Sequence, residues 1–122
     1  MPTVTASYVI SIRRADTSVE HKKSAQITLD DNKEDGRILA VGTSEEELTF
    51  SADVVGGCGY LYLENLDPTN YIEVGFETTV YVIRLRPAQA AMVPIQPTQA
   101  SIFARSNTAA CDLKFNLFRQ QA

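Results

Sequence analysis

The sequence is short of the residue types on which most recognisable chemistry depends. Its 122 residues contain no tryptophan, one histidine and two cysteines. A zinc site needs several histidine, cysteine or carboxylate ligands, and a disulfide-stabilised secreted domain needs more cysteine than this. Cys58 and Cys111 fall on expected strands, where cysteine usually acts as a small hydrophobic residue. Contact between them, bridged or not, stays open, but we predict that no bridge is needed for folding.

Clustered positive charge and long apolar runs are also missing. The net charge is −4 and the sequence pI is about 4.9, and no basic cluster is longer than Arg13-Arg14 or Lys22-Lys23. Nucleic acids and anionic membranes select clustered Lys and Arg, and a membrane helix needs about 20 apolar residues. The first residues carry no charged leader before an apolar block. We therefore expect a protein made in the cytoplasm, with no nucleic-acid or membrane partner.

What the chain does have is alternation of apolar and polar residues at period two, which is typical of strands with one buried face. Residues 3–13 show it most regularly. A second strand is expected around residues 25–29, and a polar loop at residues 30–36 separates it from a third at residues 38–41. At residues 44–47, Ser44 and Glu47 match a capping box, so a helical turn competes there with a strand over residues 47–51. A bend or bulge is expected at Gly56-Gly57 and Gly59.

The stretch GCGYLYLENLDPTNYIEVGF, residues 57–76, predicts a β-hairpin at the centre of the fold. Two apolar runs, residues 60–63 and 71–76, flank a turn at residues 67–70, where Asp67 precedes Pro68. Proline presets the backbone of a type I turn, and aspartate before it can accept a hydrogen bond from the turn. Both parities of the first run are apolar, so we expect a central strand covered on both faces.

Strands are further expected at residues 80–86, 90–95, 101–104 and 111–117. Pro94 cannot donate to a strand ladder, which predicts an edge strand at residues 90–95. In the last strand, alternate residues from Cys111 to Leu117 are expected to point inward. Eight to ten short strands with no convincing helix indicate an all-β fold. The prediction is one domain, residues 1–122, folded as a single antiparallel β-sandwich resembling a jelly roll.

Candidate chemistry along the chain is weak. His21 lies among charged residues and has no second histidine to complete a metal site. The acidic stretch at residues 30–35 fails as an EF-hand, because Lys33 falls on the third ligand position and Gly42 on the twelfth; an irregular calcium site stays open, with a solvated loop as the default. No nucleophile elbow or phosphate-binding glycine loop occurs. We expect no enzyme activity, no cofactor and no bound metal.

The second half resembles a family of small virion structural proteins of tailed bacteriophages. The resemblance is carried by GYLYLENLD at residues 59–67, NYIEVG at residues 70–75, Leu85-Arg86-Pro87, and FARSNTAA at residues 103–110, followed by an alternating strand. It covers roughly residues 58–118. It implies a sandwich fold and turn-forming motifs rather than catalytic ones. The first half of the chain has no counterpart in it.

This resemblance implies a non-enzymatic virion subunit, most simply a decoration or cement protein bound to the major capsid protein on a phage head. The alternative is a tail, baseplate or fibre-attachment subunit. A third hypothesis from another class is a carbohydrate-binding module. Glycan sites stack sugars on exposed aromatic rings, and Tyr71, Tyr81 or Phe118 would have to replace the missing tryptophan.

Residues 87–104 contain no Asp, Glu, Lys or Arg in a chain with 21% charged residues. Two sandwich strands whose outer faces carry Gln, Thr and Ser would explain this. A subunit interface would explain it too, because interface cores are depleted in charge. The interface interpretation predicts a homo-oligomer, with a trimer favoured, in contact through Met92, Val93, Ile95 and Gln96. The pattern leaves open whether Met92 or Ile95 faces the partner.

Overall fold

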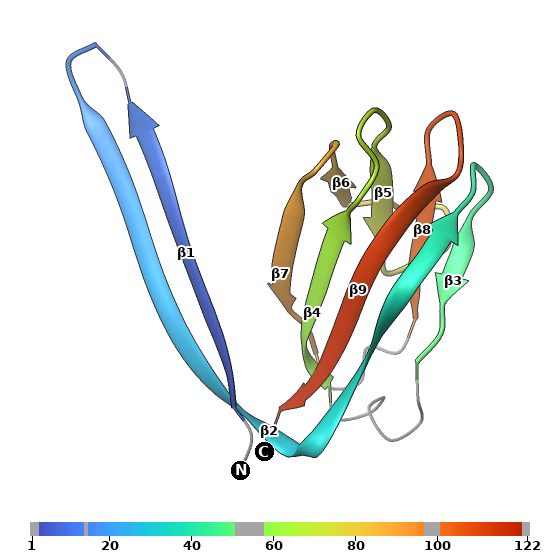
Figure 1. Cartoon of the computed structure of the whole chain (residues 1–122), viewed down its shortest axis with the longest axis horizontal. Helices are drawn as coiled ribbons and strands as arrows, with labels where there is room; N and C mark the ends of the chain where they lie inside the picture. Colours follow the sequence, from blue (N-terminus) through green and yellow to red (C-terminus); the bar gives the residue numbers. More distant parts are fainter. Residues whose placement is uncertain (1–2, 14, 51–57, 97–100, 121–122) are drawn as a thin grey trace.

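The computed structural model describes residues 3–13, 15–50, 58–96 and 101–120, and in these ranges the chain forms strands and no helix (Figure 1). The strands are β1 (Thr3–Arg13), β2 (Ser18–Val41), β3 (Glu46–Leu48), β4 (Cys58–Asn65), β5 (Ile72–Gly75), β6 (Ile83–Leu85), β7 (Ala90–Pro94), β8 (Ile102–Ser106) and β9 (Cys111–Gln120). The all-β prediction is confirmed. No helical turn forms at residues 44–47, where Ser44 lies in a bend; the strand predicted at residues 47–51 is the shorter β3, and residue 51 lies outside the described ranges. Gly56-Gly57 lie outside the described residues, but the register between β4 and β9 shifts between Cys58 and Tyr60, which confirms the irregularity predicted next to Gly59.

The strands form two antiparallel sheets, with the orders β1-β2-β9-β4-β7 and β3-β8-β5-β6. Leaving β1 aside, the eight remaining strands pair as β2-β9-β4-β7 and β3-β8-β5-β6, which is the strand order of a jelly roll. The jelly-roll prediction is therefore confirmed. Closing two sheets face to face lets each strand bury one row of alternate side chains.

The core lies between the two sheets. It consists of Val41, Leu48, Leu61, Leu63, Ile72, Val74, Leu85, Ile102, Ala104, Cys111, Leu113, Phe115 and Leu117. The inward row predicted for the last strand is confirmed, since its four alternate residues from Cys111 to Leu117 are all buried. Phe50 meets the Phe115 ring edge-on at 5.4 Å between centroids. The prediction that both faces of β4 are covered is wrong, because Tyr60 and Tyr62 on its outer side are only half-buried.

The predicted central hairpin is wrong. β4 pairs with β9 and β7, whereas β5 pairs with β6 and β8, so residues 66–71 cross from one sheet to the other. The side chain of Asn65, fully buried, holds this crossing. Its amide nitrogen donates to the carbonyl oxygens of Asn70, Leu85 and Arg86 at 2.8, 3.0 and 3.2 Å. An apolar side chain there would leave these oxygens without that donor.

The turn itself has the predicted chemistry. Asp67 Oδ2 accepts hydrogen bonds from the backbone N–H groups of Thr69 and Asn70, at 2.9 and 2.6 Å. These two bonds to the charged form hold the pKa of the Asp67 carboxyl below its ordinary value. The sequence pattern thus identified a turn correctly but not which strands it joins.

The loop predicted at residues 30–36 is also wrong, because β2 runs unbroken for 24 residues. It continues by changing partner, pairing with β1 up to Thr28 and with β9 at Leu29 and again from Glu34 to Val41. The register shifts between Leu29 and Glu34, an irregularity of the kind that bends a strand. The side chains of residues 29–33 are not described, so the calcium hypothesis stays untested.

β1 and the first half of β2 form a two-stranded arm, defined here as residues 3–28, that leaves the jelly roll (Figure 1). The sequence predicts one buried face for these strands. Instead Tyr8, Ile10 and Val19 on its apolar side are 55%, 52% and 45% exposed. His21 is likewise exposed, as predicted. The difference arises because, in the described ranges, no second layer of strands packs on these three side chains.

Gly75 allows the chain to fold back over β5. A Cβ atom built on Gly75 would lie 1.8 Å from the carbonyl oxygen of Val80. That oxygen is brought close by the bridge between Glu77 and Val80 and by the hydrogen bond from Val82 N–H to Val74 O at 3.0 Å. Only a residue without a side chain fits this approach.

Candidate interaction surface

The structure separates the four residues predicted to lie at an interface. β7 is an edge strand, as predicted, since it pairs only with β4 in its sheet. The register sets Met92 opposite Tyr62 on the outer face and Val93 opposite the buried Leu61 on the inner face. Val93, Ile95 and Gln96 line a small hollow of about 210 Å³ beside Phe76. Met92 therefore lies half-buried on the outer face, while Ile95 packs against the core.

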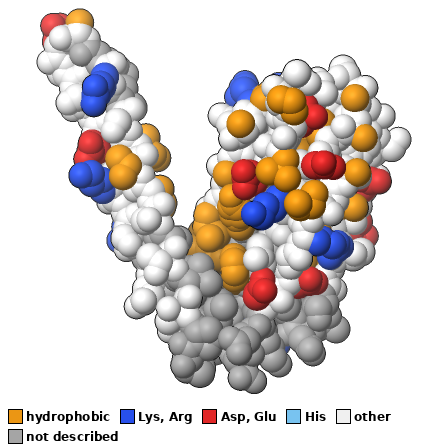
Figure 2. Space-filling model, in the orientation of Figure 1, with side chains coloured by type: hydrophobic (Ala, Val, Ile, Leu, Met, Phe, Trp, Pro, Cys, Tyr) orange, Lys and Arg blue, Asp and Glu red, His pale blue; other side chains and the backbone are white. Residues whose placement is uncertain are grey.

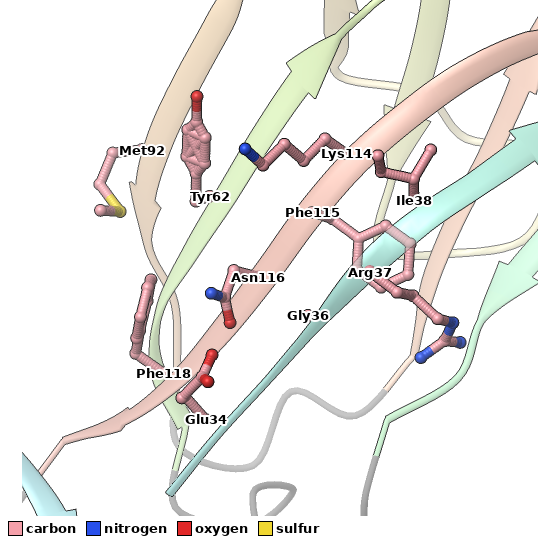
Figure 3. A pocket seen from close by; sticks show the side chains of 10 residues that line it. All are labelled: Glu34, Gly36, Arg37, Ile38, Tyr62, Met92, Lys114, Phe115, Asn116 and Phe118. Atoms are coloured by element: carbon pink, nitrogen blue, oxygen red, sulfur yellow. The ribbon is translucent and has the colours of Figure 1, made fainter. Parts of the chain in front are cut away.

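Met92 is one wall of a larger hollow of about 440 Å³ on the outer face of the five-stranded sheet (Figure 3). Its apolar lining includes Ile38, Tyr62, Met92 and Phe118, which belong to four different strands, and Phe115 of β9. The Tyr62 hydroxyl donates to Glu64 Oε1 at 2.7 Å. This bond to a carboxylate raises the pKa of Tyr62 and fixes the position of its ring.

A polar group lies between these apolar side chains. The Oδ1 atom of Asn116 is buried and has no hydrogen-bond partner among the described residues. Asn116 can lie here because its neighbour on β2 is Gly36, where an added Cβ would come within 2.7 Å of Asn116 Cγ. The surface thus combines the exposed Ile38 and the half-buried Tyr62, Met92 and Phe118 with a buried acceptor that has no donor among the described residues.

The outer face of the other sheet is different, because its side chains already satisfy one another. Glu73 lies between Arg84 and Arg105, at 3.4 and 3.3 Å from their guanidinium nitrogens. The guanidinium of Arg84 covers the Tyr71 ring at 4.1 Å, and that of Arg105 covers the Tyr81 ring at 4.3 Å. Such cation–π contacts occupy the ring faces.

This contrast bears on the carbohydrate hypothesis. Tyr71 and Tyr81 each have a guanidinium over the ring, and Phe118 belongs to the other sheet. The three aromatic residues proposed for sugar stacking therefore form no common platform, which disfavours that hypothesis.

Glu45 joins the loop before β3 to the turn between β5 and β6. Its carboxylate accepts hydrogen bonds from the Thr78 hydroxyl, from Thr79 N–H at 2.6 Å and from the Tyr81 hydroxyl. These three bonds, led by that from Thr78, hold the pKa of Glu45 below its ordinary value of 4.5. The charged carboxylate therefore stabilises the folded state.

We expect Glu45→Gln to lower the melting temperature at neutral pH, by an amount that shrinks in acid. Because the folded pKa of Glu45 is below 4.5, its contribution is complete above pH 4.5 and is lost as the pH falls through that lowered value. Thermal melts of both chains at pH 7 and at about pH 3 measure this. Glu77→Gln is the control, since no hydrogen bond to its side chain occurs in the described part. An equal difference at both pH values would contradict the prediction.

The described residues hold no group of three His, Cys, Asp or Glu side chains that could bind a metal ion. Cys111 is a free thiol, and burial raises its pKa. The backbone of Cys58 pairs with Arg119, eight residues along β9 from Cys111, or about 26 Å at strand spacing. Strand backbones this far apart are beyond the reach of a disulfide within one chain. The prediction that folding needs no bridge stays a prediction. No helix long and apolar enough to cross a membrane is found in the described ranges.

No protein-family model, curated protein or solved structure matches the chain. Strand order and surface chemistry are therefore the basis for assigning a class, which is a jelly-roll sandwich carrying a hairpin arm. Sequence reasoning found Met92 but missed Tyr62 and the exposed arm. The sequence did contain a signal for Tyr62: the apolar residues of both parities in β4 indicate an apolar outer face as well as a buried inner one.

Proposed function

We propose that this protein is a non-enzymatic structural subunit of a bacteriophage virion, most simply a decoration or cement protein that binds the major capsid protein on the head. The observation that carries the proposal is the arm. A two-stranded ribbon is at best marginally stable alone in water, yet this one extends from the sandwich with Tyr8, Ile10 and Val19 exposed. A subunit that completes its fold in an assembly accounts for such an arm.

Two further features support this role. The jelly roll is an architecture of viral capsid proteins, although it also occurs in lectins and cupins, so the fold is an analogy and not evidence of function. The resemblance of residues 58–118 to phage virion subunits points the same way, and its motifs fall on the crossing between β4 and β5 and on the β8–β9 turn. A homo-oligomer, with a trimer favoured, fits the charge-free edge strand β7.

A tail, baseplate or fibre-attachment subunit is the second candidate, because the same arm would serve there. Location and copy number distinguish the two. A decoration protein covers the head in numbers comparable with those of the major capsid protein, whereas a tail component is confined to one end of the particle in few copies.

The test is to purify virus particles from the culture that carries this gene and to label them with antibody raised against the purified chain. Gold label over the head, together with mass spectrometric copy numbers close to those of the capsid protein, is the expected result. Antibody absorbed with the purified chain is the control. Label at the tail selects the second candidate. Absence of the chain from filled particles, while it is abundant in the soluble fraction, would overturn both.

A further inference from the structure

We propose that the arm clasps a second copy of this chain: its apolar face covers the outer face of the neighbour's five-stranded sheet, around Tyr62 and Met92. The inference rests on the proposed assembly role and specifies which two surfaces meet. It follows from four features of the molecule, namely the two faces of the arm, the opening beside it, the charges and the area.

The arm has two unlike faces. Residues paired across an antiparallel ribbon share a face, so Tyr8 shares one with Lys23, Ile10 with His21, and Val19 lies in the same row. The opposite face carries Thr5 with Gln26 and Ser7 with Ser24. Val9 is the one exposed large apolar residue on that polar face. Only the first face has the composition of a contact surface.

The arm and the sheet stand apart and leave a V-shaped opening between them. Figure 2 shows hydrophobic side chains on both of its walls. A hollow of about 580 Å³ in this opening is lined by Tyr8 and Ile10 from the apolar face of the arm, by Thr5 and Ser7 from its polar face, and by Tyr62, Ala90, Ala91 and Met92 of the sheet. Because the arm does not lie on its own sheet, both surfaces are left to a neighbouring molecule.

Charge favours a copy of the same chain as that neighbour. Residues 1–28 contain four Lys or Arg and two Asp or Glu, whereas residues 29–122 contain seven and thirteen. The arm therefore carries a net charge of +2 and the remainder −6. On the surfaces that would meet, Lys23 shares the face of Tyr8, and the outer hollow is lined by Glu34 together with Arg37 and Lys114. The complementarity is therefore between the arm as a whole and the remainder of the chain. Complementary charge of this kind orients association.

The surface area that the arm can bury fits an assembly in which every copy gives an arm to a neighbour and receives one. A ribbon of 11 residue pairs is about 36 Å long and about 10 Å wide. Covering one face then removes about 700 Å² of surface, counted on both partners. One arm alone falls short of a stable interface of about 1,200–2,000 Å². Two copies that exchange arms bury about 1,400 Å², and a ring of three buries about 2,100 Å².

The first experiment is sedimentation of the full chain with single lysine substitutions. Ile10→Lys alters the arm face and Met92→Lys the sheet face. Val9→Lys, on the opposite face of the same arm, and Val82→Lys, exposed elsewhere, are the matched controls. We expect an oligomer whose dissociation constant rises about tenfold or more for each test variant, with much smaller changes for the controls. Thermal melts verify that each variant stays folded.

The second experiment identifies which molecule the arm touches. Chains carrying Ile10→Cys are mixed with chains carrying Met92→Cys, and a disulfide-linked heterodimer is expected; Val9→Cys mixed with Met92→Cys is the control. A link that forms only within a chain carrying both substitutions would overturn the proposal in favour of an arm closed on its own sheet. A strict monomer, or an oligomer indifferent to both lysine variants, would overturn it too, while particle labelling would still decide the virion role.

Discussion

Asn65→Asp is expected to lower the free energy of unfolding by about 4 kcal/mol at neutral pH. The side chain is fully buried, and its amide donates to the carbonyl oxygens of Asn70, Leu85 and Arg86. A carboxylate of the same shape has no donor and places negative charge against these oxygens. The crossing between the sheets, and with it the jelly roll, would lose the group that holds it.

The loss should be smaller in acid. The carbonyl oxygens favour the neutral acid, so the folded pKa of the introduced carboxyl group lies above its unfolded value of about 3.9. Its destabilising effect is therefore least below that pH and grows as the pH rises through the folded pKa. Chemical denaturation at several pH values measures this. Asn107→Asp is the control, because Asn107 is exposed and only accepts a bond, from Tyr71 N–H at 3.1 Å. Equal losses for the two variants would contradict the argument.

Gly75→Val is expected to cost about 3 kcal/mol, or a fall of roughly 10 °C in melting temperature. Its Cβ would lie 1.8 Å from the Val80 carbonyl oxygen, and this obstacle is backbone, which no side-chain rotation relieves. The turn after β5 would have to open. Gly42→Ala is the matched control, because nothing lies within 4 Å of the position its Cβ would take. If the Gly75 variant had the same melting temperature as the Gly42 variant, the turn would have adapted to the added side chain without cost.

Local patterns predicted the strands well, because alternation reflects which side chains a sheet buries. The inward row from Cys111 to Leu117 and the edge position of Pro94 both followed from single-strand rules. Which strands pair with one another did not follow from these single-strand rules. The turn at Asp67 is compatible with a hairpin and with a crossing, and only the buried Asn65 amide, bonded to Leu85 and Arg86, distinguishes them.

The arm was missed for a related reason. Alternation in residues 3–13 indicates that one face is covered, but not by what. Tyr8, Ile10 and Val19 on that face are exposed, so the pattern that predicts an internal core strand here describes a surface of the chain. The acidic residues after Leu29 suggested a loop, yet a strand can pass through them by changing its neighbour from β1 to β9. The amino-acid composition of a segment does not indicate such a change of strand partner.

The position of β9 has a consequence for the order in which the subunit can fold. β9 is synthesised after the eight other strands, yet it lies between β2 and β4 and pairs with both. Until it emerges, these two strands lack their shared neighbour and the larger sheet stays divided. Such distant pairing slows folding. A chain stopped before β9 has an arm but no sheet to receive one, so only finished chains can both give and accept an arm.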